Sequence, residues 1–468
     1  MTYNEALSFW YARVNYEVRS AGPLDLKLER MRALMRRLGD PQDRLRLVHV
    51  TGTKGKGSTC AMLASVLRVA GYRVGLFTSP HLEHVEERIQ VNGASISHAE
   101  LSSCMEEVAP AVRAMEAETH LVRENHPRVP PATPYCLPSP TFFEIGTALG
   151  FLHFVRRRCD IAVLEVGLGG RFDSTNVCCP LVSVITNIGF DHTAQLGNTL
   201  EAITYQKAGI IKPRVPVVSG VTQDGPRAVI RQVAEEVRAP LWEVGSNPSP
   251  TPPLRREGLQ TEDGASLFGS APPPFLGEGV GGRGSLGLLG AHQLQNATVA
   301  FAAIERLCES GMHISDEAVA RGLAEVKWPA RVEVIRERPV IILDTAHNVP
   351  SAESLVNTLR ASFPLSGTKR VVFAVSSDKQ FADILRVLAG YFDHFHLTKY
   401  GNNPRCVPPE KLAATLATVA PSKAASVHAT AADAWRTARG AAGESDLVCV
   451  TGSVFLAGEL RPLIGESL

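Results

Sequence analysis

Residues 49–59 constrain this chain most, because they join an apolar strand pattern to a helix pattern through a glycine-rich turn. Residues 45–50 contain the apolar run of a buried parallel strand, and residues 61–69 repeat apolar side chains at helical spacing. Glycines without a Cβ let backbone N–H groups approach phosphate oxygens, and a helix N-terminus adds positive potential. The segment therefore predicts a phosphate-binding turn, of the P-loop kind, at the edge of a doubly wound, mainly parallel α/β sheet.

Seven residues of this turn are candidates for contacting a nucleotide: Gly52, Thr53, Gly55, Lys56, Gly57, Ser58 and Thr59. Lys56 is long enough to reach the outer phosphates, and the hydroxyl of Ser58 or Thr59 is a possible ligand for Mg²⁺. The spacing departs from the usual P-loop, because Gly57 separates the lysine from the hydroxyl residues. The alternative is a tight glycine turn with a solvated lysine, but strand, glycines, lysine, hydroxyls and helix occur here together.

The composition favours a small-molecule partner. A length of 468 residues is enough for two or three domains with sizeable cores. Lys plus Arg number 48 and Asp plus Glu number 47, so the formal charge is only +1. This balance creates no long-range field that would attract nucleic acid or an anionic membrane.

Cysteine usage and the absence of an apolar run of membrane-spanning length indicate a cytoplasmic protein. Nine cysteines are scattered without a CxxC pair, and Cys178 adjoins Cys179, a poor spacing for zinc or for a simple disulfide. A reducing compartment fits this usage. The sequence starts without a signal-peptide pattern, and no apolar run reaches membrane-spanning length. We therefore expect a soluble cytoplasmic protein.

A strand end and a helix start supply candidate substrate residues. Residues 74–77 read as a strand, and Ser79 and His81 follow at its C-terminal end, where doubly wound sheets bind ligands. Glu144 follows Thr141 at capping-box spacing, so it either caps a helix or takes part in a substrate site. These two interpretations stay equally open at the level of the sequence.

Two further strand patterns end in groups that can bind a metal. Glu165 comes near the end of the apolar run 160–166, and a carboxylate there is costly unless a positive group such as Mg²⁺ meets it. Residues 181–186 form another apolar strand, which places Asp191 and His192 at the same sheet edge. Taken alone, His192 is more simply a hydrogen-bonded loop histidine, but its context favours a role in the site.

Lys207 lies among apolar neighbours on a helix predicted from residue 199 onward. Burial would lower the pKa of its ammonium and make the free amine available for reaction with CO2. The simpler alternative packs the aliphatic stem on the helix and leaves the ammonium in solvent.

Seven ordered motifs together resemble folylpolyglutamate synthase, commonly bifunctional with dihydrofolate synthase in bacteria, within the ATP-dependent Mur ligase superfamily. These motifs occupy residues 49–59, 77–82, 88–93, 141–144, 165–176, 185–192 and 207–212. The resemblance implies ATP and two Mg²⁺ ions, held in part by Ser58, Glu165 and His192. It also implies that Lys207 is carbamylated, because a carbamate carries negative charge and can hold a metal.

The second half of the chain carries further motifs of the same family. By resemblance, Asn296 would contact the adenine, and Arg331, in a linker motif, would contact the ATP phosphates. Asp344 would hold the ribose hydroxyls. His347 and Ser453 would lie near the incoming glutamate.

Strand and helix patterns alternate again after residue 328, which predicts a second, smaller, Rossmann-like α/β domain. We predict an ATP-binding, Mur ligase-like domain over residues 1–327 and a C-terminal, glutamate-binding domain over residues 328–468. Residues 246–285 are rich in Pro, Gly, Ser and charge, so they read as a loop insertion in the first domain.

The resemblance implies ATP-dependent ligation of L-glutamate to the carboxylate of dihydropteroate or a reduced folate through an acyl phosphate, by an enzyme that is usually monomeric. The residues expected to carry catalysis are Lys56, Lys207, His192 and Arg331. A muramyl peptide ligase on the same scaffold and a nucleotide-binding regulator without catalysis are the alternatives. Lys54, Gln206 and Thr345 stand where the family usually has asparagine, glutamate and glycine, which affects nucleotide and substrate details more than the reaction class.

Overall fold

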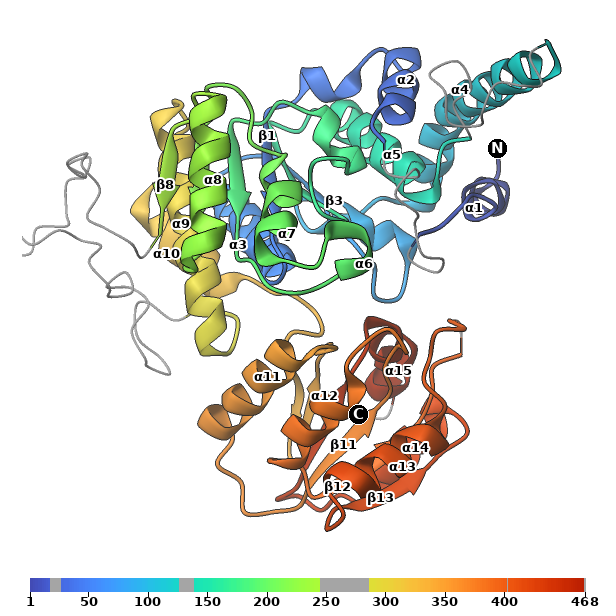
Figure 1. The fold of residues 1–468 in the computed structure, drawn as a ribbon, viewed down its shortest axis with the longest axis vertical. Coiled ribbons are helices and arrows are strands. Elements are labelled where there is room, and N and C mark those ends of the chain that lie inside the picture. Colours follow the sequence, from blue (N-terminus) through green and yellow to red (C-terminus); the bar gives the residue numbers. More distant parts are fainter. Residues whose placement is uncertain (17–26, 126–138, 245–285, 402, 467–468) are drawn as a thin grey trace, which may run out of the picture. The chain divides into compact units, whose positions relative to one another are not determined.

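The computed structural model describes residues 1–16, 27–125, 139–244, 286–401 and 403–466. The chain divides into two compact units, and the long C-terminal segment of unit 2 is coloured from orange to red in Figure 1. Unit 1 comprises Met1–Ser79, Glu86–Gly287 and Leu294–Val326, and unit 2 comprises Pro80–Val85, Leu288–Gln293 and Lys327–Leu468. Two short segments from the first two-thirds of the sequence thus belong to unit 2. The loop insertion predicted over residues 246–285 lies outside the described residues.

Unit 1 is built on an eight-stranded sheet with the order β4-β3-β2-β5-β1-β6-β7-β8. Its strands are β1 (Leu47–Thr51), β2 (Val74–Phe77), β3 (Ile89–Val91), β4 (Ala94–Ser95), β5 (Ile161–Glu165), β6 (Val182–Ile185), β7 (Val217–Ser219) and β8 (Leu241–Glu243). Every neighbouring pair from β2 to β8 is parallel, whereas β3 pairs antiparallel with β2 and with β4. The mainly parallel sheet predicted from the sequence is therefore confirmed, with β1 in its buried interior.

The structure describes ten helices before Lys327, the residue at which the last segment of unit 2 begins. They are α1 (Tyr3–Tyr11), α2 (Glu29–Arg37), α3 (Lys56–Val69), α4 (His98–Asn125), α5 (Phe142–Arg156), α6 (Thr193–Leu196), α7 (Leu200–Ala208), α8 (Asp224–Glu236), α9 (Ala291–Glu309) and α10 (Asp316–Glu325). The capping-box spacing of Ser97 and Glu100 predicts a helix from there to about Met115, and the polar segment after it reads as a loop. Helix α4 continues instead to Asn125, because residues 116–125 contain neither proline nor glycine. No helix in the described ranges is long and apolar enough to cross a membrane.

Unit 2 contains a six-stranded sheet with the order β13-β12-β11-β14-β10-β9. Its strands are β9 (Glu333–Glu337), β10 (Val340–Leu343), β11 (Lys369–Phe373), β12 (His394–Leu397), β13 (Ala424–Val427) and β14 (Leu447–Thr451). Its helices are α11 (Val349–Ser362), α12 (Phe381–Ala389), α13 (Pro409–Val419), α14 (Ala431–Gly440) and α15 (Val454–Glu466). The antiparallel edge strand β9 was not predicted, because its charged, partly exposed residues read as a linker.

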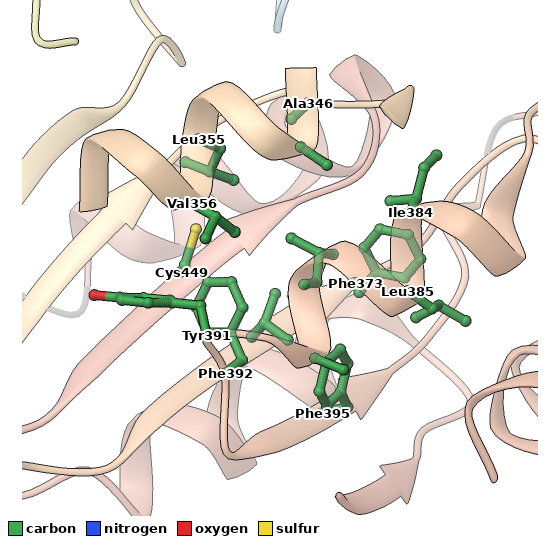
Figure 2. Close-up of a cluster of buried hydrophobic side chains, with 14 of the residues drawn as sticks. Ala346, Leu355, Val356, Phe373, Ile384, Leu385, Tyr391, Phe392, Phe395 and Cys449 are labelled. Atoms are coloured by element: carbon green, nitrogen blue, oxygen red, sulfur yellow. The ribbon is translucent and has the colours of Figure 1, made fainter. Parts of the chain in front are cut away.

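Alternating residues of the unit 2 strands face two separate cores. On β11, Val371 and Phe373 belong to one core, and Val372 belongs to the other. The first core is covered by α11, α12 and α13 and is shown in part in Figure 2, where Phe373, Phe392 and Phe395 lie among aliphatic side chains. The second is covered by α14 and α15. Burial on both faces explains why the central strands β10 and β14 are nearly continuous apolar runs in the sequence.

Three buried histidines are held in the neutral form. Burial lowers the pKa of His49 and His396 to about 3 and that of His153 to about 4. A histidine in an unfolded chain titrates near about pH 6.5, so below that pH the unfolded state binds protons that the folded state does not. Their contribution to stability is complete above about pH 6.5 and is lost progressively as the pH falls below it.

We therefore expect the thermal unfolding midpoint to decrease as the pH is lowered from about 7 to about 5.5. Most carboxylates do not titrate in this pH range. His153→Gln should make this decrease shallower, because the unfolded variant has one proton acceptor fewer. His313→Gln is the matched control, since His313 is exposed. Calorimetry measures the midpoint, and a constant value across this window would contradict the neutral burial of these histidines.

Candidate functional site

The turn between β1 and α3 depends on two glycines. Gly52 has a φ of +153°, and Gly55, the N-cap of α3, has a φ of +78°. A Cβ on Gly52 would lie 1.9 Å from Thr186 Oγ1, and a Cβ on Gly55 would lie 2.1 Å from Asn296 Oδ1. Both glycines therefore combine a left-handed conformation with a close approach that a side chain would block. The second contact brings Asn296, from α9, directly against the phosphate turn.

Two lysines share one carbonyl oxygen of this turn. Lys56 Nζ lies 3.3 Å and Lys207 Nζ lies 2.8 Å from the oxygen of Gly52. Burial, and then the positive charge of Lys56, hold the pKa of Lys207 well below its usual value. The amine of Lys207 is thus buried, which contradicts the alternative that its ammonium extends into solvent.

Lys54 connects the turn to the loop that follows β6. Lys54 Nζ lies 2.9 Å from Asp191 Oδ2, while Asp191 Oδ1 accepts a hydrogen bond from the backbone N–H of His192 at 3.1 Å. The His192 ring is half-exposed, and its Nε2 lies 3.9 Å from the same carboxylate oxygen. The lysine that replaces the family's asparagine is therefore paired with the carboxylate next to His192.

Thr186 and Asn187 are not among the residues predicted from the sequence, yet they hold the phosphate turn in place. Asn187 accepts hydrogen bonds from the backbone N–H of Thr53 at 2.9 Å and of Lys54 at 2.8 Å. The Thr186 hydroxyl donates to the Lys54 carbonyl at 2.6 Å. The sequence could have indicated them, because Thr186 ends the apolar run 181–186 and Asn187 follows it, which puts both at the same sheet edge as the turn.

The start of α3 contains a polar group that lacks a partner. Ser58 and Thr59 are both buried there. Among the residues that the structure describes, Thr59 Oγ1 makes no hydrogen bond. A buried hydroxyl without a partner is unfavourable. Such a hydroxyl, together with the free N–H groups of a helix start, fits a bound phosphate.

Glu165 supplies a buried carboxylate next to the turn. It ends β5, beside β1, and its Oε2 accepts a hydrogen bond from the Ser79 N–H at 3.3 Å. Over the described part of the chain, no three or more His, Cys, Asp or Glu residues form a group that could hold a metal ion. Magnesium keeps several waters and binds through one or two carboxylates and the phosphates of its substrate, so the buried carboxylate of Glu165 suits it, and Ser58 and His192 stay predicted ligands.

Glu144 forms the cap that its spacing indicates. Thr141 Oγ1 accepts the Glu144 N–H at 3.2 Å, and Glu144 Oε2 accepts the Thr141 N–H at 2.8 Å. The same oxygen lies 2.6 Å from Arg30 Nε in a buried ion pair. A structural role for Glu144 is therefore observed, and a role in a substrate site stays a prediction. Of the other two candidate substrate residues before it, Ser79 belongs to unit 1 and His81 to unit 2.

In unit 2, Asp344 ties together the chain segments around the end of β10. Its carboxylate accepts hydrogen bonds from the backbone N–H groups of Ala346 at 2.7 Å and Val332 at 3.0 Å, and from the Thr451 hydroxyl at 3.3 Å. Asp344 therefore orders the loop that carries His347, whatever else it binds.

Arg331 and His347 are both anchored through Thr345. Arg331 Nη1 donates to the Ala330 carbonyl at 2.9 Å and to the Thr345 hydroxyl, so the threonine in place of the family's glycine gives Arg331 a partner. His347 Nδ1 lies 2.8 Å from the Thr345 carbonyl oxygen. Because a carbonyl only accepts, Nδ1 carries a hydrogen, and a neutral ring keeps its lone pair on Nε2.

Ser453 lies between the end of β14 and the start of α15. Its Oγ accepts a hydrogen bond from the Phe455 N–H at 3.1 Å, and its carbonyl accepts one from the Ala457 N–H at 3.1 Å. Asp344, His347 and Ser453 therefore lie in loops at the C-terminal ends of the adjacent strands β10 and β14. This edge is where doubly wound sheets bind ligands.

Two family models match the chain. The Mur ligase middle domain matches residues 138–304, and the glutamate ligase domain of Mur ligases matches residues 330–454. Residues 305–329 separate the two matches, and the last segment of unit 2 begins within this interval, at Lys327.

Curated relatives match nearly the whole chain. The dihydrofolate synthase/folylpolyglutamate synthase of Bacillus subtilis is 35% identical over 466 residues, which cover 98% of this chain and 98% of that protein. The folylpolyglutamate synthase of Lacticaseibacillus casei is 32% identical over 441 residues, which cover 92% of this chain and 93% of that protein.

Solved structures show the same fold. E. coli FolC in complex with DHPP and ADP has a TM-score of 0.77 and 29% identity, and the match covers 100% of this chain and 98% of that one. Mycobacterium tuberculosis folylpolyglutamate synthase complexed with ADP has a TM-score of 0.80 and 27% identity, with 99% and 98% covered. The bifunctional Yersinia pestis synthase complexed with AMPPNP and a Mn ion has a TM-score of 0.75 and 28% identity, with 99% and 98% covered.

Proposed function

This chain belongs to the dihydrofolate synthase/folylpolyglutamate synthase family of Mur ligases, and we propose that it ligates L-glutamate to the carboxylate of dihydropteroate or a reduced folate at the expense of ATP. Its relatives are named for these two activities, and solved relatives bind ADP or AMPPNP. In this chain, the observation that carries the proposal is the glycine turn in which Lys56 and Lys207 converge on the Gly52 carbonyl.

The proposed reaction has two steps. The acceptor carboxylate attacks the γ-phosphorus of ATP, ADP leaves, and an acyl phosphate forms. The amino group of glutamate then attacks the acyl carbon, and the tetrahedral intermediate loses phosphate and a proton to give the amide. Such phosphoryl transfer requires little covalent chemistry from the protein, so positioning and neutralisation of charge provide most of the catalysis.

Lys56 and the start of α3 supply that neutralisation in unit 1. The backbone N–H groups of the turn cradle the phosphates, and Lys56 places a positive charge beside them. Bound Mg²⁺, held by Ser58, Glu165 and His192, would polarise the γ-phosphate as a Lewis acid. The proximity of Asn296 to Gly55 supports its proposed contact with the nucleotide.

We propose that Lys207 acts as its carbamate. The neutral amine nitrogen attacks the carbon of CO2, a proton is released to solvent, and an anionic carbamate forms. The depressed pKa of Lys207 supports this step, because only the free amine has the required lone pair. The reaction also places an anion next to Lys56, whose positive charge attracts it.

In unit 2, His347 and Ser453 are proposed to bind glutamate, and Arg331 and Asp344 to bind the nucleotide. This assignment rests on the C-terminal strand ends where these loops lie and on the match to the glutamate ligase domain over residues 330–454.

We expect phosphate release from ATP that depends on L-glutamate, Mg²⁺ and a pteridine acceptor, measured with dihydropteroate and tetrahydrofolate in parallel. Release with both acceptors establishes a bifunctional synthase, and release with one identifies the activity that this chain has. A UDP-linked muramyl acceptor serves as the negative control for the muramyl ligase alternative. ATP binding with no release for either pteridine acceptor would contradict the proposal and favour the regulator.

A further inference from the structure

The loop that follows β5 binds the end of the helix that carries Lys207. The Arg171 N–H donates to the Gln206 carbonyl at 2.7 Å. The side-chain Nδ2 of Asn176 donates to the carbonyls of Arg171 and Gly209, both at 3.0 Å. One amide group thus joins the loop to the helix end. Two of these three bonds reach the last turn of α7, one on either side of Lys207.

Loop and helix are packed here too closely for additional atoms. A Cβ on Gly170 would lie 2.8 Å from the Lys207 carbonyl oxygen. A Cβ on Gly209 would lie 2.3 Å from the Arg171 Cβ. The guanidinium carbon of Arg171 also lies 3.9 Å from the centroid of the Tyr205 ring, an attractive cation–π contact with α7. The end of α7 therefore cannot shift unless the loop shifts with it.

The other side of the loop is bound to β1, the strand that leads into the phosphate turn. The Thr51 hydroxyl donates to the Gly169 carbonyl at 2.6 Å. The hydroxyl oxygen of Thr175 lies 2.8 Å from Nε2 of His49, which is also on β1. The loop therefore connects this strand, and with it the phosphate turn, to the helix of Lys207.

This connection matters because a lysine side chain is long and flexible. Lys207 Nζ lies 2.8 Å from the Gly52 carbonyl oxygen, in a buried position that holds its pKa well below the usual value. A lysine in water has a pKa of about 10.4, so only about one amine in a thousand is free near neutral pH. If the end of α7 moved, Nζ would reach solvent and take up a proton, and it would no longer react with CO2.

We propose that Asn176 and Arg171 are positioning residues for Lys207, because they hold the end of α7 so that the amine stays at Gly52, where the carbamate forms. In that step the amine nitrogen bonds to the carbon of CO2 and one proton leaves to solvent. This inference rests on the proposed function, which assigns the carbamate to Lys207. The competing explanation is that these contacts only stabilise the fold. Their loss would then lower the unfolding temperature but not the carbamate content of the folded protein.

Asn176→Ala removes the side-chain amide and tests this difference. We expect the bicarbonate concentration for half-maximal carbamate to rise roughly 5- to 20-fold, because two hydrogen bonds are lost. ¹³C NMR with labelled bicarbonate measures the carbamate directly, and Lys207→Ala identifies its resonance. The pH for half-maximal carbamate should also move upward, because a displaced amine regains a more usual pKa. Turnover should be low at ambient CO2 and should recover as bicarbonate is raised.

Gly209→Ala tests the same contact from the side of the helix, and it carries the test if Asn176→Ala does not fold. Gly209 has a φ of −62°, so alanine adds no backbone strain and only the clash with Arg171 remains. It should raise the required bicarbonate concentration as Asn176→Ala does. Gly440→Ala is the matched control, because Gly440 ends α14 and nothing lies within 4 Å of its added Cβ. This control should leave the bicarbonate dependence unchanged.

The possible failures are distinguishable. An unchanged bicarbonate dependence of the carbamate in both Asn176→Ala and Gly209→Ala, even if turnover falls, would overturn the inference and leave the proposed ligation intact. A wild-type protein that gives no carbamate resonance would overturn the carbamate at Lys207, and this inference with it. Phosphate release that does not depend on glutamate would overturn the proposed ligation, the reaction that Lys207 is proposed to serve.

Discussion

Lys207→Ala is expected to reduce glutamate-dependent turnover roughly 10²- to 10³-fold or more while the protein stays folded. The amine of Lys207 is buried 2.8 Å from the Gly52 carbonyl, inside the phosphate turn, so alanine removes the group from which the proposed carbamate forms. Loss of a buried group with a depressed pKa should not greatly reduce stability, because burying it is itself unfavourable. Steady-state phosphate release and thermal unfolding of the same samples measure the two effects.

Lys212→Ala is the matched control for this change. Lys212 is also a partly buried lysine that donates to a backbone carbonyl, that of Asn176, at 3.0 Å, and burial also lowers its pKa. It should keep turnover within severalfold of the wild-type value. Removing CO2 and bicarbonate should lower the wild-type rate and not the residual rate of Lys207→Ala, and ¹³C-labelled bicarbonate should give a carbamate resonance only with Lys207 present. A wild-type rate in Lys207→Ala would contradict the catalytic role proposed for Lys207.

Gly55→Ala is expected to weaken ATP binding by roughly 10- to 100-fold. Its φ of +78° is strained for any residue with a side chain, and the new methyl group would lie 2.1 Å from Asn296 Oδ1. The phosphate turn and Asn296 would both have to shift, which moves the N-terminus of α3 away from the phosphates. Isothermal titration with ATP and with a non-hydrolysable analogue measures the dissociation constant.

Gly71→Ala separates backbone strain from the clash. Gly71 has a φ of +93°, but nothing lies within 4 Å of its added Cβ. This variant should lose about 1–2 kcal/mol of stability through strain and bind ATP as the wild type does. If Gly55→Ala also bound ATP with wild-type affinity, the phosphate turn could not be the nucleotide site.

Elements that depend on neighbouring residues could be predicted from the sequence. The strand, turn and helix around residues 49–59 follow from apolar periodicity and glycine, and the capping box of α5 follows from the three-residue spacing of Thr141 and Glu144. The errors have the same local origin. The end of α4 was placed too early because polar residues were read as a loop, and β9 was missed because an edge strand with exposed side chains lacks a strong apolar pattern.

The partners of the site residues could not be predicted in this way. Lys207 donates to Gly52, 155 residues earlier in the sequence, and Arg30 pairs with Glu144, 114 residues later. The ion pair of Lys54 with Asp191 and the hydrogen bond of Arg331 to Thr345 also depend on which strand ends become neighbours. Lys54 and Thr345 differ from the residues usual in the family, and the sequence does not show what they contact. Only their partners in the structure show where the charge of Lys54 and the hydroxyl of Thr345 are directed.

The sequence by itself determined the two α/β units, the phosphate turn and the family, because backbone preferences, burial patterns and ordered motifs are properties of short stretches of chain. The tertiary structure decided that the Lys207 amine is buried against Gly52 rather than solvated, that Glu144 is bound by Arg30, and that Lys54 is paired with Asp191. The physical reason is that burial and hydrogen-bond partners arise when distant segments pack together. A side chain's pKa and orientation depend on those neighbours, whose identity cannot be read from its position in the sequence.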